Sequence, residues 1–170
     1  MKKKPLLWLM IITCIVLLFQ VKNFMFVKYK VEGVSMDPTF TDGTELLINK
    51  FSPKLTKISR FDYVLFHGPK NQILIKRVIG LPGESIKYVD DQLFVDGVKW
   101  KEPYLKEQKK HKMGNVLTGD FQLKAITGQN KIKKNHYFVI GDNRIHSFDS
   151  RHFGTISKDQ VVGVKRNQDE

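Results

Sequence analysis

A long apolar run opens the chain, and short strand-like segments separated by turns follow it. The run from Pro5 to Val27 contains one charged residue, Lys22, and reaches the roughly 20 residues that a helix needs to cross a hydrocarbon core. The lysines at 2–4 favour a cytoplasmic N-terminus, because positive residues beside a span tend to stay inside. The pattern therefore predicts a single-pass protein of the cell membrane, with a cytoplasmic tail at 1–4, a transmembrane anchor at 5–27 and an extracytoplasmic domain at 28–170.

The alternative for this run is a secretory signal peptide that is removed from the mature protein. A cleavable signal needs small residues, in an A-x-A-like pattern, directly after its apolar core. The residues that follow Phe19 are QVKNFMFVKYK, which are too bulky for such a site. We therefore expect the run to remain attached as an anchor.

From residue 28 onward, segments rich in β-branched and aromatic residues alternate with turn sequences. Asp96-Gly97 lies between two of these segments and is a strong hairpin signal. The stretch 99–134 differs, because it is lysine-rich and weakly patterned, and we expect a peripheral, less ordered insertion there. The prediction is a mainly β domain, with strand segments near 28–34, 44–51, 61–67, 71–80, 86–100, 136–143 and 159–166.

Charge and cysteine content narrow the possible partners. The formal net charge of +12 suggests a polyanionic neighbour, such as an anionic lipid surface or an acidic cell wall. The lysines are scattered and form no compact basic block with interleaved aromatic residues, so we expect no nucleic-acid partner. Cys14 is the single cysteine, which excludes a disulfide within the chain and a cysteine-based metal site.

One serine and one lysine raise a chemical question. Ser35 lies in VEGVSMDPTF, with no histidine nearby, and is either a turn residue or a nucleophile whose base comes from elsewhere. Lys76 shares a strand face with Leu74 and Val78, and apolar surroundings lower the pKa of a lysine. A base near neutral pH would need a fall of about 3 units from about 10.4. The alternatives for Lys76 are that it reaches outward to water or pairs with an acid.

A second group of polar residues lies in GDNRIHSFDSRHFG, residues 141–154. Its alternating acids and arginines predict a loop that ion pairs hold rigid. Its acids are also candidate partners for Arg77, which stays charged. A calcium loop is excluded, because Arg144 and His146 stand where oxygen ligands would be needed. His146 and His152 lie close to acids, so a Ser-His-Asp arrangement stays open. Ser147 is a candidate hydrogen-bond partner for a lysine base.

Four motifs in order, VEGVSMDPT, DGTELLINK, KRVIGLPGE and GDNRIHSFDSR, resemble those of the type I signal peptidases, in their compact Gram-positive form. Members of that family are membrane-anchored serine proteases that release exported proteins from their signal peptides. The resemblance implies a signal-peptidase-like antiparallel β-sheet domain with one N-terminal transmembrane helix. It also implies cleavage after small residues (A-x-A sites) of exported preproteins, next to membrane lipid and the secretion translocon, with neither a metal nor an organic cofactor.

The resemblance also implies roles for individual residues. Ser35 corresponds to the nucleophile and Lys76 to the general base, and the Ser35 backbone N–H corresponds to an oxyanion-hole donor. Some members place a second, hydroxyl donor two residues before the nucleophile, where this chain has Gly33, so the second donor is left open. Glu84 stands where many relatives have Asp. The supporting positions implied by the resemblance are Ser147, Asp149, Arg151, Arg77 and Asp142.

Three other protein classes fit parts of the sequence. A Ser-Lys self-cleaving regulatory domain shares the dyad, but such proteins are soluble, which the predicted anchor argues against. A catalytically inactive, membrane-anchored binding relative would not need Ser35 and Lys76 to be intact. A polyanion-binding surface protein would account for the charge, and would show salt-dependent binding without proteolysis.

Overall fold

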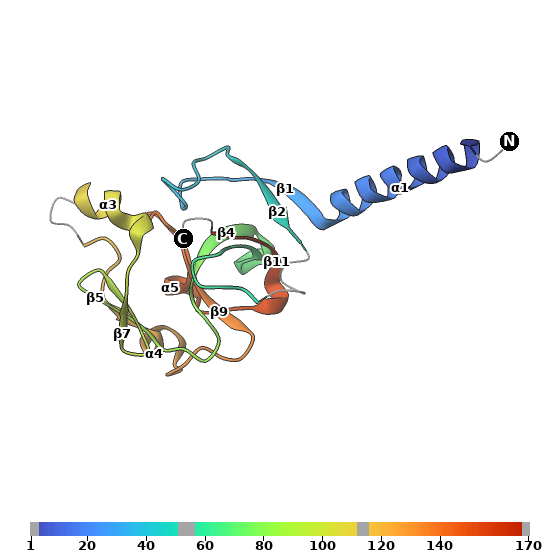
Figure 1. Cartoon of the computed structure of the whole chain (residues 1–170). Helices are drawn as coiled ribbons and strands as arrows, with labels where there is room; N and C mark the ends of the chain where they lie inside the picture. Colours follow the sequence, from blue (N-terminus) through green and yellow to red (C-terminus); the bar gives the residue numbers. More distant parts are fainter. Residues whose placement is uncertain (1–3, 51–56, 112–115, 168–170) are drawn as a thin grey trace.

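The computed structural model describes residues 4–50, 57–111 and 116–167. A 22-residue helix, α1 (Lys4–Met25), projects from a domain that consists mainly of two antiparallel sheets (Figure 1). Most of the predicted tail, residues 1–3, lies outside the described residues. The prediction of a mainly β domain with antiparallel sheets is confirmed.

The larger sheet has seven strands, and the smaller has four. Short helical segments lie between the strands along the chain: η1 (Pro69–Asn71), η2 (Pro103–Leu105), α3 (Lys106–His111), α4 (Leu123–Thr127), α5 (Ser150–Phe153) and η3 (Lys158–Gln160). In spatial order the larger sheet contains β1 (Phe26–Lys30), β2 (Glu45–Asn49), β11 (Val161–Lys165), β3 (Tyr63–His67), β4 (Ile73–Gly80), β9 (His136–Ile140) and β10 (Ile156–Ser157). The smaller sheet contains, in order, β7 (Val98–Trp100), β6 (Gln92–Val95), β5 (Ile86–Val89) and β8 (Phe121–Gln122).

Strand β4 is an inner strand of the larger sheet, and both of its faces are covered. It pairs with β3 on one side, where Lys76 lies opposite Val64, and with β9 on the other. Because side chains alternate along a strand, Ile75 and Val78 enter two different apolar clusters. The sequence expectation of an apolar strand that carries two cations in its interior is therefore met by the fold.

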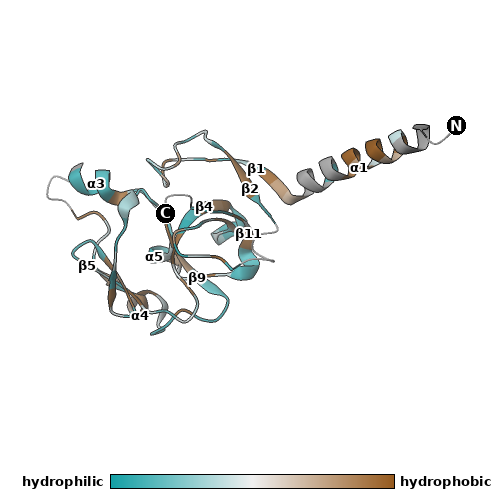
Figure 2. Cartoon of the chain, viewed as in Figure 1, coloured by the Kyte–Doolittle hydropathy of each residue, from teal (hydrophilic) through white to brown (hydrophobic). Residues whose placement is uncertain are grey.

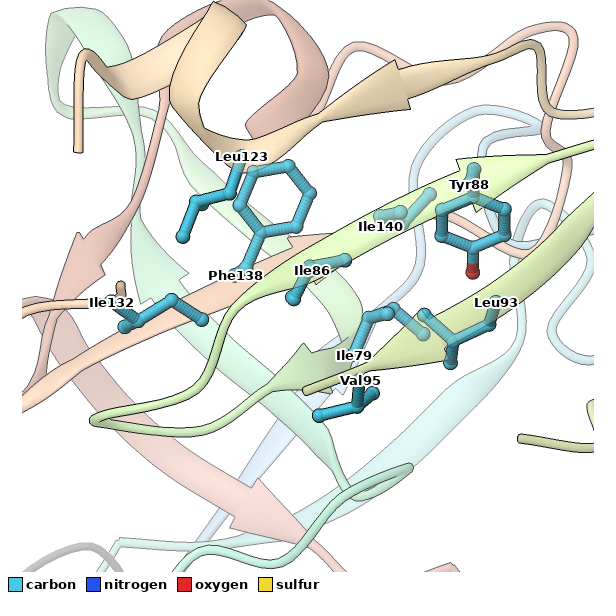
Figure 3. Close-up of a cluster of buried hydrophobic side chains, with 9 residues drawn as sticks. All are labelled: Ile79, Ile86, Tyr88, Leu93, Val95, Leu123, Ile132, Phe138 and Ile140. Atoms are coloured by element: carbon cyan, nitrogen blue, oxygen red, sulfur yellow. The ribbon is translucent and has the colours of Figure 1, made fainter. Parts of the chain in front are cut away.

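One apolar cluster joins the two sheets (Figure 3). Strands β4 and β9 contribute from the larger sheet, and β5 and β6 contribute from the smaller one. Burial of such side chains is the main favourable contribution to folding, at about 25 cal/mol per Å² of apolar surface. The buried members of the cluster are Ile79, Ile86, Tyr88, Leu93, Val95, Leu123, Ile132, Phe138 and Ile140.

The lysine-rich stretch 99–134 has more order than its sequence suggested. In its described part it forms η2, α3, β8 and α4, and residues 112–115 lie outside the described residues. Leu105, Leu117, Leu123 and Ile132 from this stretch are all buried. Their wide spacing among lysines hid the pattern, because η2 and α4 each contain one fully buried apolar residue, Leu105 and Leu123.

Helix α1 carries the apolar run. Within the residues that the structure describes, no helix meets the combined length and apolarity needed to cross a membrane. The described side chains of α1 from Trp8 to Leu17 are exposed. Figure 2 shows the hydropathy of the helix along its length. Cys14 is among them and forms no disulfide.

A buried ionic network ties the smaller sheet to the loop that follows β9. The guanidinium of Arg144 donates to Glu102 Oε1 at 2.5 Å and to the hydroxyls of Tyr88, Tyr104 and Thr118 at 3.1, 3.0 and 2.9 Å. Both tyrosine hydroxyls also donate to Glu102 Oε1. The side chains of Arg144 and Glu102 are 0% exposed, so each charge depends on the other for compensation.

We expect Glu102→Gln to destabilise the fold by about 3–5 kcal/mol, because the substitution leaves the Arg144 charge buried without a carboxylate. Glu107→Gln is the matched control, since Glu107 pairs with Lys110 at the surface, where loss of a pair costs under about 1 kcal/mol. Urea unfolding of the detergent-solubilised chain measures both. Equal effects of the two substitutions would contradict a stabilising role for the buried network.

Candidate active site

Ser35 lies in a tight turn after β1 that several hydrogen bonds hold in place. The Asp37 N–H donates to Val34 O, and the Phe40 N–H donates to Met36 O. Met36 is fully buried and anchors the turn in the apolar cluster below it. The turn therefore presents Ser35, which is half-buried, from a fixed backbone.

Lys76 reaches Ser35 from the inner strand β4. Its Nζ lies 2.7 Å from Ser35 Oγ, and it donates to the Ile75 carbonyl at 3.0 Å. The residue is only 2% exposed. Burial lowers the pKa of Lys76 to about 8, although the charges of Asp149 and Asp142 act in the opposite direction. The neutral fraction near physiological pH is therefore much larger than for a solvent-exposed lysine, and the neutral form is the one that a general base requires.

Arg77, the next residue, points to the opposite face of β4 and pairs with Asp142. Nε and one terminal nitrogen of Arg77 donate to the two carboxylate oxygens at 2.8 and 2.6 Å, and both side chains are 0% exposed. Thr39 Oγ1 donates to the same carboxylate at 2.5 Å. Since Thr39 belongs to the Ser35 turn, this pair links β4, the turn and the loop after β9. The guanidinium also lies over the Tyr104 ring, 3.7 Å from its centroid.

Asp149 organises the far end of the same loop. Its carboxylate accepts two hydrogen bonds of 2.9 Å from the Arg151 side chain and one of 3.0 Å from the Gly141 N–H. It also caps the N-terminus of α5 through the Arg151 N–H. Burial alone would raise the pKa of Asp149, but the bonds and charge of Arg151 outweigh it and keep the pKa below its usual value. Asp149 is therefore an anion placed to act on Lys76.

Ser147 lies close to the Ser35 turn, and Gly141 lies between them. A Cβ on Gly141 would lie 2.2 Å from Ser147 Oγ and 2.4 Å from the Ser35 carbonyl oxygen, so the two segments close on Gly141 from both sides. The Asn143 N–H fastens the contact by donating to the Ser35 carbonyl at 3.1 Å. Within the described residues Ser147 Oγ is buried and makes no hydrogen bond of normal geometry, although its hydroxyl lies close enough to the Asp149 carboxylate to help lower the pKa of that group. The Ile75 carbonyl takes the bond to Lys76.

The backbone conformation at position 33 explains why this residue is a glycine. Its φ is +79°, in the left-handed region that favours glycine, and its N–H donates to Asp42 Oδ1 at 2.7 Å. That N–H is therefore already engaged. The Ser35 N–H makes no hydrogen bond to any described residue.

The histidine alternative gains no support from the geometry. His146 and His152 are exposed, and His152 Nδ1 lies 3.9 Å from Asp149 Oδ1 while its ring packs near Phe148. In the described part of the chain the hydrogen-bond partner of Ser35 Oγ is Lys76. A search of the same residues found no group of three or more His, Cys, Asp or Glu side chains placed to hold a metal ion.

Sequence reasoning missed several residues of the site. Thr39 carried a signal, because it is a hydroxyl four residues after the candidate nucleophile. Glu102 and Tyr104 carried none, since they lie in the lysine-rich stretch that looked peripheral. The Ile75 carbonyl is a backbone group and has no sequence signature.

Comparison with known proteins identifies relatives of this chain in sequence and in fold. The family model described as Signal peptidase, peptidase S26, matches residues 5–167. Signal peptidase I V of Bacillus subtilis (strain 168) is 58% identical over 162 residues, which cover 95% of this chain and 96% of that relative. Signal peptidase IB of Staphylococcus aureus (strain Mu50 / ATCC 700699) is 44% identical over 168 residues, covering 96% and 88%. The crystal structure of a signal peptidase I from Enterococcus faecalis V583 matches with a TM-score of 0.62 at 41% identity, covering 65% of this chain and 98% of that one.

The family model and the sequence matches span nearly the full chain, and the structural match agrees with them over 65% of it. The chain therefore belongs to the signal peptidase family, peptidase S26, and is a serine endopeptidase of the signal peptidase I type.

Proposed function

We propose that the chain is a membrane-held endopeptidase that cuts signal peptides from exported preproteins, with Ser35 as nucleophile and Lys76 as general base. The observation that carries the assignment is the 2.7 Å approach of Lys76 Nζ to Ser35 Oγ. Burial of the lysine, which lowers its pKa to about 8, makes the pair chemically competent.

The reaction follows from this pair. Neutral Lys76 takes the proton of Ser35 Oγ as the oxygen attacks the scissile carbonyl carbon. The C–N bond then breaks, Lys76 returns the proton to the leaving amine, and the signal peptide stays attached to Ser35 as an ester. Lys76 next takes a proton from a water molecule as the water oxygen attacks the ester carbon. The ester C–O bond then breaks, and Lys76 returns the proton to Ser35 Oγ, which restores the free serine and the neutral lysine. Two ion pairs position the site: Arg77 with Asp142, and Arg151 with Asp149. Ser147 contributes a buried hydroxyl beside the Ser35 turn.

The oxyanion that forms during attack needs hydrogen-bond donors close to Ser35. The Ser35 N–H fits this role, because it has no other partner among the described residues. Gly33 supplies no hydroxyl, and its N–H is held by Asp42. The second donor therefore comes from another group or from water.

Preproteins are the proposed substrates because the relatives are named signal peptidases. The family resemblance supports cleavage after small residues at A-x-A sites, with the substrate bound as an extended strand. Exported preproteins arrive at the secretion translocon, which is the expected neighbour of the enzyme.

Membrane attachment through α1 is the second part of the proposal. Eight large apolar side chains between Trp8 and Leu17 are 41–64% exposed, which is unusual for a helix in water. The helix projects away from the domain, so no part of the described fold covers them (Figure 2). A lipid hydrocarbon core, with the N-terminus in the cytoplasm, is the proposed environment of α1.

The full chain with Ile12→Lys and Ile15→Lys should lose membrane attachment, because each lysine at the centre of a span costs about 2.5–3.5 kcal/mol. Leu47→Lys with Val116→Lys is the matched control, since these side chains are exposed on the domain. Flotation of reconstituted vesicles after an alkaline wash measures the bound fraction. Retention of the α1 variant would overturn the attachment.

Ser35→Ala and Lys76→Ala should each lower preprotein cleavage by about 10⁴-fold or more, because each removes half of the dyad. His146→Ala is the control and should keep most of the activity, since His146 is exposed and does not contact Ser35. Cleavage of a preprotein with an A-x-A site, followed by gel electrophoresis, gives the rates. Cleavage by both alanine variants at the normal rate would identify another nucleophile, whereas no cleavage by the parent chain would identify an inactive binding relative.

A further inference from the structure

A basic groove lies between β7 and α3, and neither Ser35 nor Lys76 is among the residues that line it. Its cavity measures about 490 Å³, and a tryptophan forms part of its wall. We call it the lysine groove, and the residues that line it are Gln92, Lys99, Trp100, Lys101, Glu102, Pro103, Lys106, Lys109 and Lys110.

The positive charge of the lysine groove is only partly compensated, because Lys110 pairs with Glu107 at 2.8 Å while three of the five lysines have no acid partner among the described residues. Its one acid, Glu102, is committed to Arg144, and Lys109 approaches the other oxygen of Glu102 only to 3.8 Å. In the described part of the chain no ion pair involves Lys99, Lys101 or Lys106. Ammonium groups gathered around one cavity repel each other. An anionic ligand bound in the cavity would reduce this repulsion.

The chemistry of the groove suits phosphate groups. All five cations are lysines, whose compact ammonium groups suit phosphate oxygens without a fixed geometry. The fork of an arginine would instead impose a fixed, bidentate geometry on a carboxylate or a phosphate. The groove therefore suits several phosphates bound in a flexible manner.

Trp100 adds an apolar wall inside this ring of charges. Its ring is 40% exposed and lies against the Arg60 guanidinium at 4.2 Å. A ligand that alternates anionic groups with uncharged connectors can place phosphates on the lysines and a connector on the indole. A flat lipid surface fits a concave groove less well than a flexible chain does.

The groove also adjoins the catalytic turn. Lys106, Lys109 and Lys110 share one face of α3, because residues at i, i+3 and i+4 are neighbours on a helix. Gln108 projects from the other side and donates to the Asp37 carbonyl at 3.3 Å, two residues from Ser35. A polymer held in the lysine groove would thus bind beside the site without occupying it.

We propose that the lysine groove binds a phosphodiester polymer, in which phosphates alternate with short uncharged connectors. This site lies beyond the peptidase activity and uses none of its catalytic residues. Its occupant would hold the domain near a polyanionic matrix while Ser35 and Lys76 remain accessible.

Binding of fluorescent poly(glycerol phosphate) to the full chain in neutral detergent tests the proposal, with anisotropy as the readout. The affinity should fall steeply with salt, because bound phosphates release counterions. Lys101→Gln with Lys106→Gln should weaken binding about tenfold or more and reduce the salt slope by about two. Lys124→Gln with Lys134→Gln carries the same charge change on exposed lysines outside the groove and should bind like the parent chain.

Three outcomes would overturn the proposal. Equal weakening in the control pair would show a general effect of net charge. Displacement of the polymer by inorganic phosphate at equal phosphate concentration would show that the groove does not recognise a chain. Displacement by micelles doped with phosphatidylglycerol at equal phosphate concentration would identify a lipid headgroup as the occupant. Because the readout is binding, failure here is separate from any failure of the peptidase assignment.

Discussion

The contact between Lys76 Nζ and Ser35 Oγ requires a lysine side chain to lie inside a β-sheet domain. Water would keep this lysine protonated, whereas the apolar residues of the neighbouring strands lower its pKa to about 8. The nucleophile must then come to the lysine, since the lysine is fixed on an inner strand. The turn after β1 achieves this by burying Met36 and leaving Ser35 beside the ammonium nitrogen.

The loop from Gly141 to Arg151 connects the parts that must meet around this contact. Asp142 pairs with Arg77 and holds Thr39 of the serine turn, Arg144 reaches the smaller sheet through Glu102, and Asp149 caps α5 while it pairs with Arg151. Each of the buried arginines Arg77 and Arg144 thus has a carboxylate of its own. Lys76 differs from them, because in the described part of the chain it has no ion pair, and this difference leaves it free to exchange a proton.

Much of the strand arrangement could be predicted, because β-branched segments and turn residues mark short strands regardless of their partners. Lys76 stood out because a cation between Leu74 and Val78 is costly without a purpose. The Glu102–Arg144 pair could not be found, since its partners are 42 residues apart and Glu102 lies among lysines. The closeness of Gly141 to both Ser35 and Ser147 was also hidden, because a glycine that leaves space looks in sequence like a glycine that makes a turn.

The most direct test of this account is the titration of Lys76 itself. Nuclear magnetic resonance of the chain with ¹⁵N-labelled lysine side chains, assigned by the signal that Lys76→Met removes, gives its pKa. The account predicts a value of about 8, well below the usual 10.5, because burial disfavours the ammonium form. Below that pH the lysine is charged and cannot accept the serine proton. A measured pKa near or above 10.5 would contradict the role of Lys76 as the base.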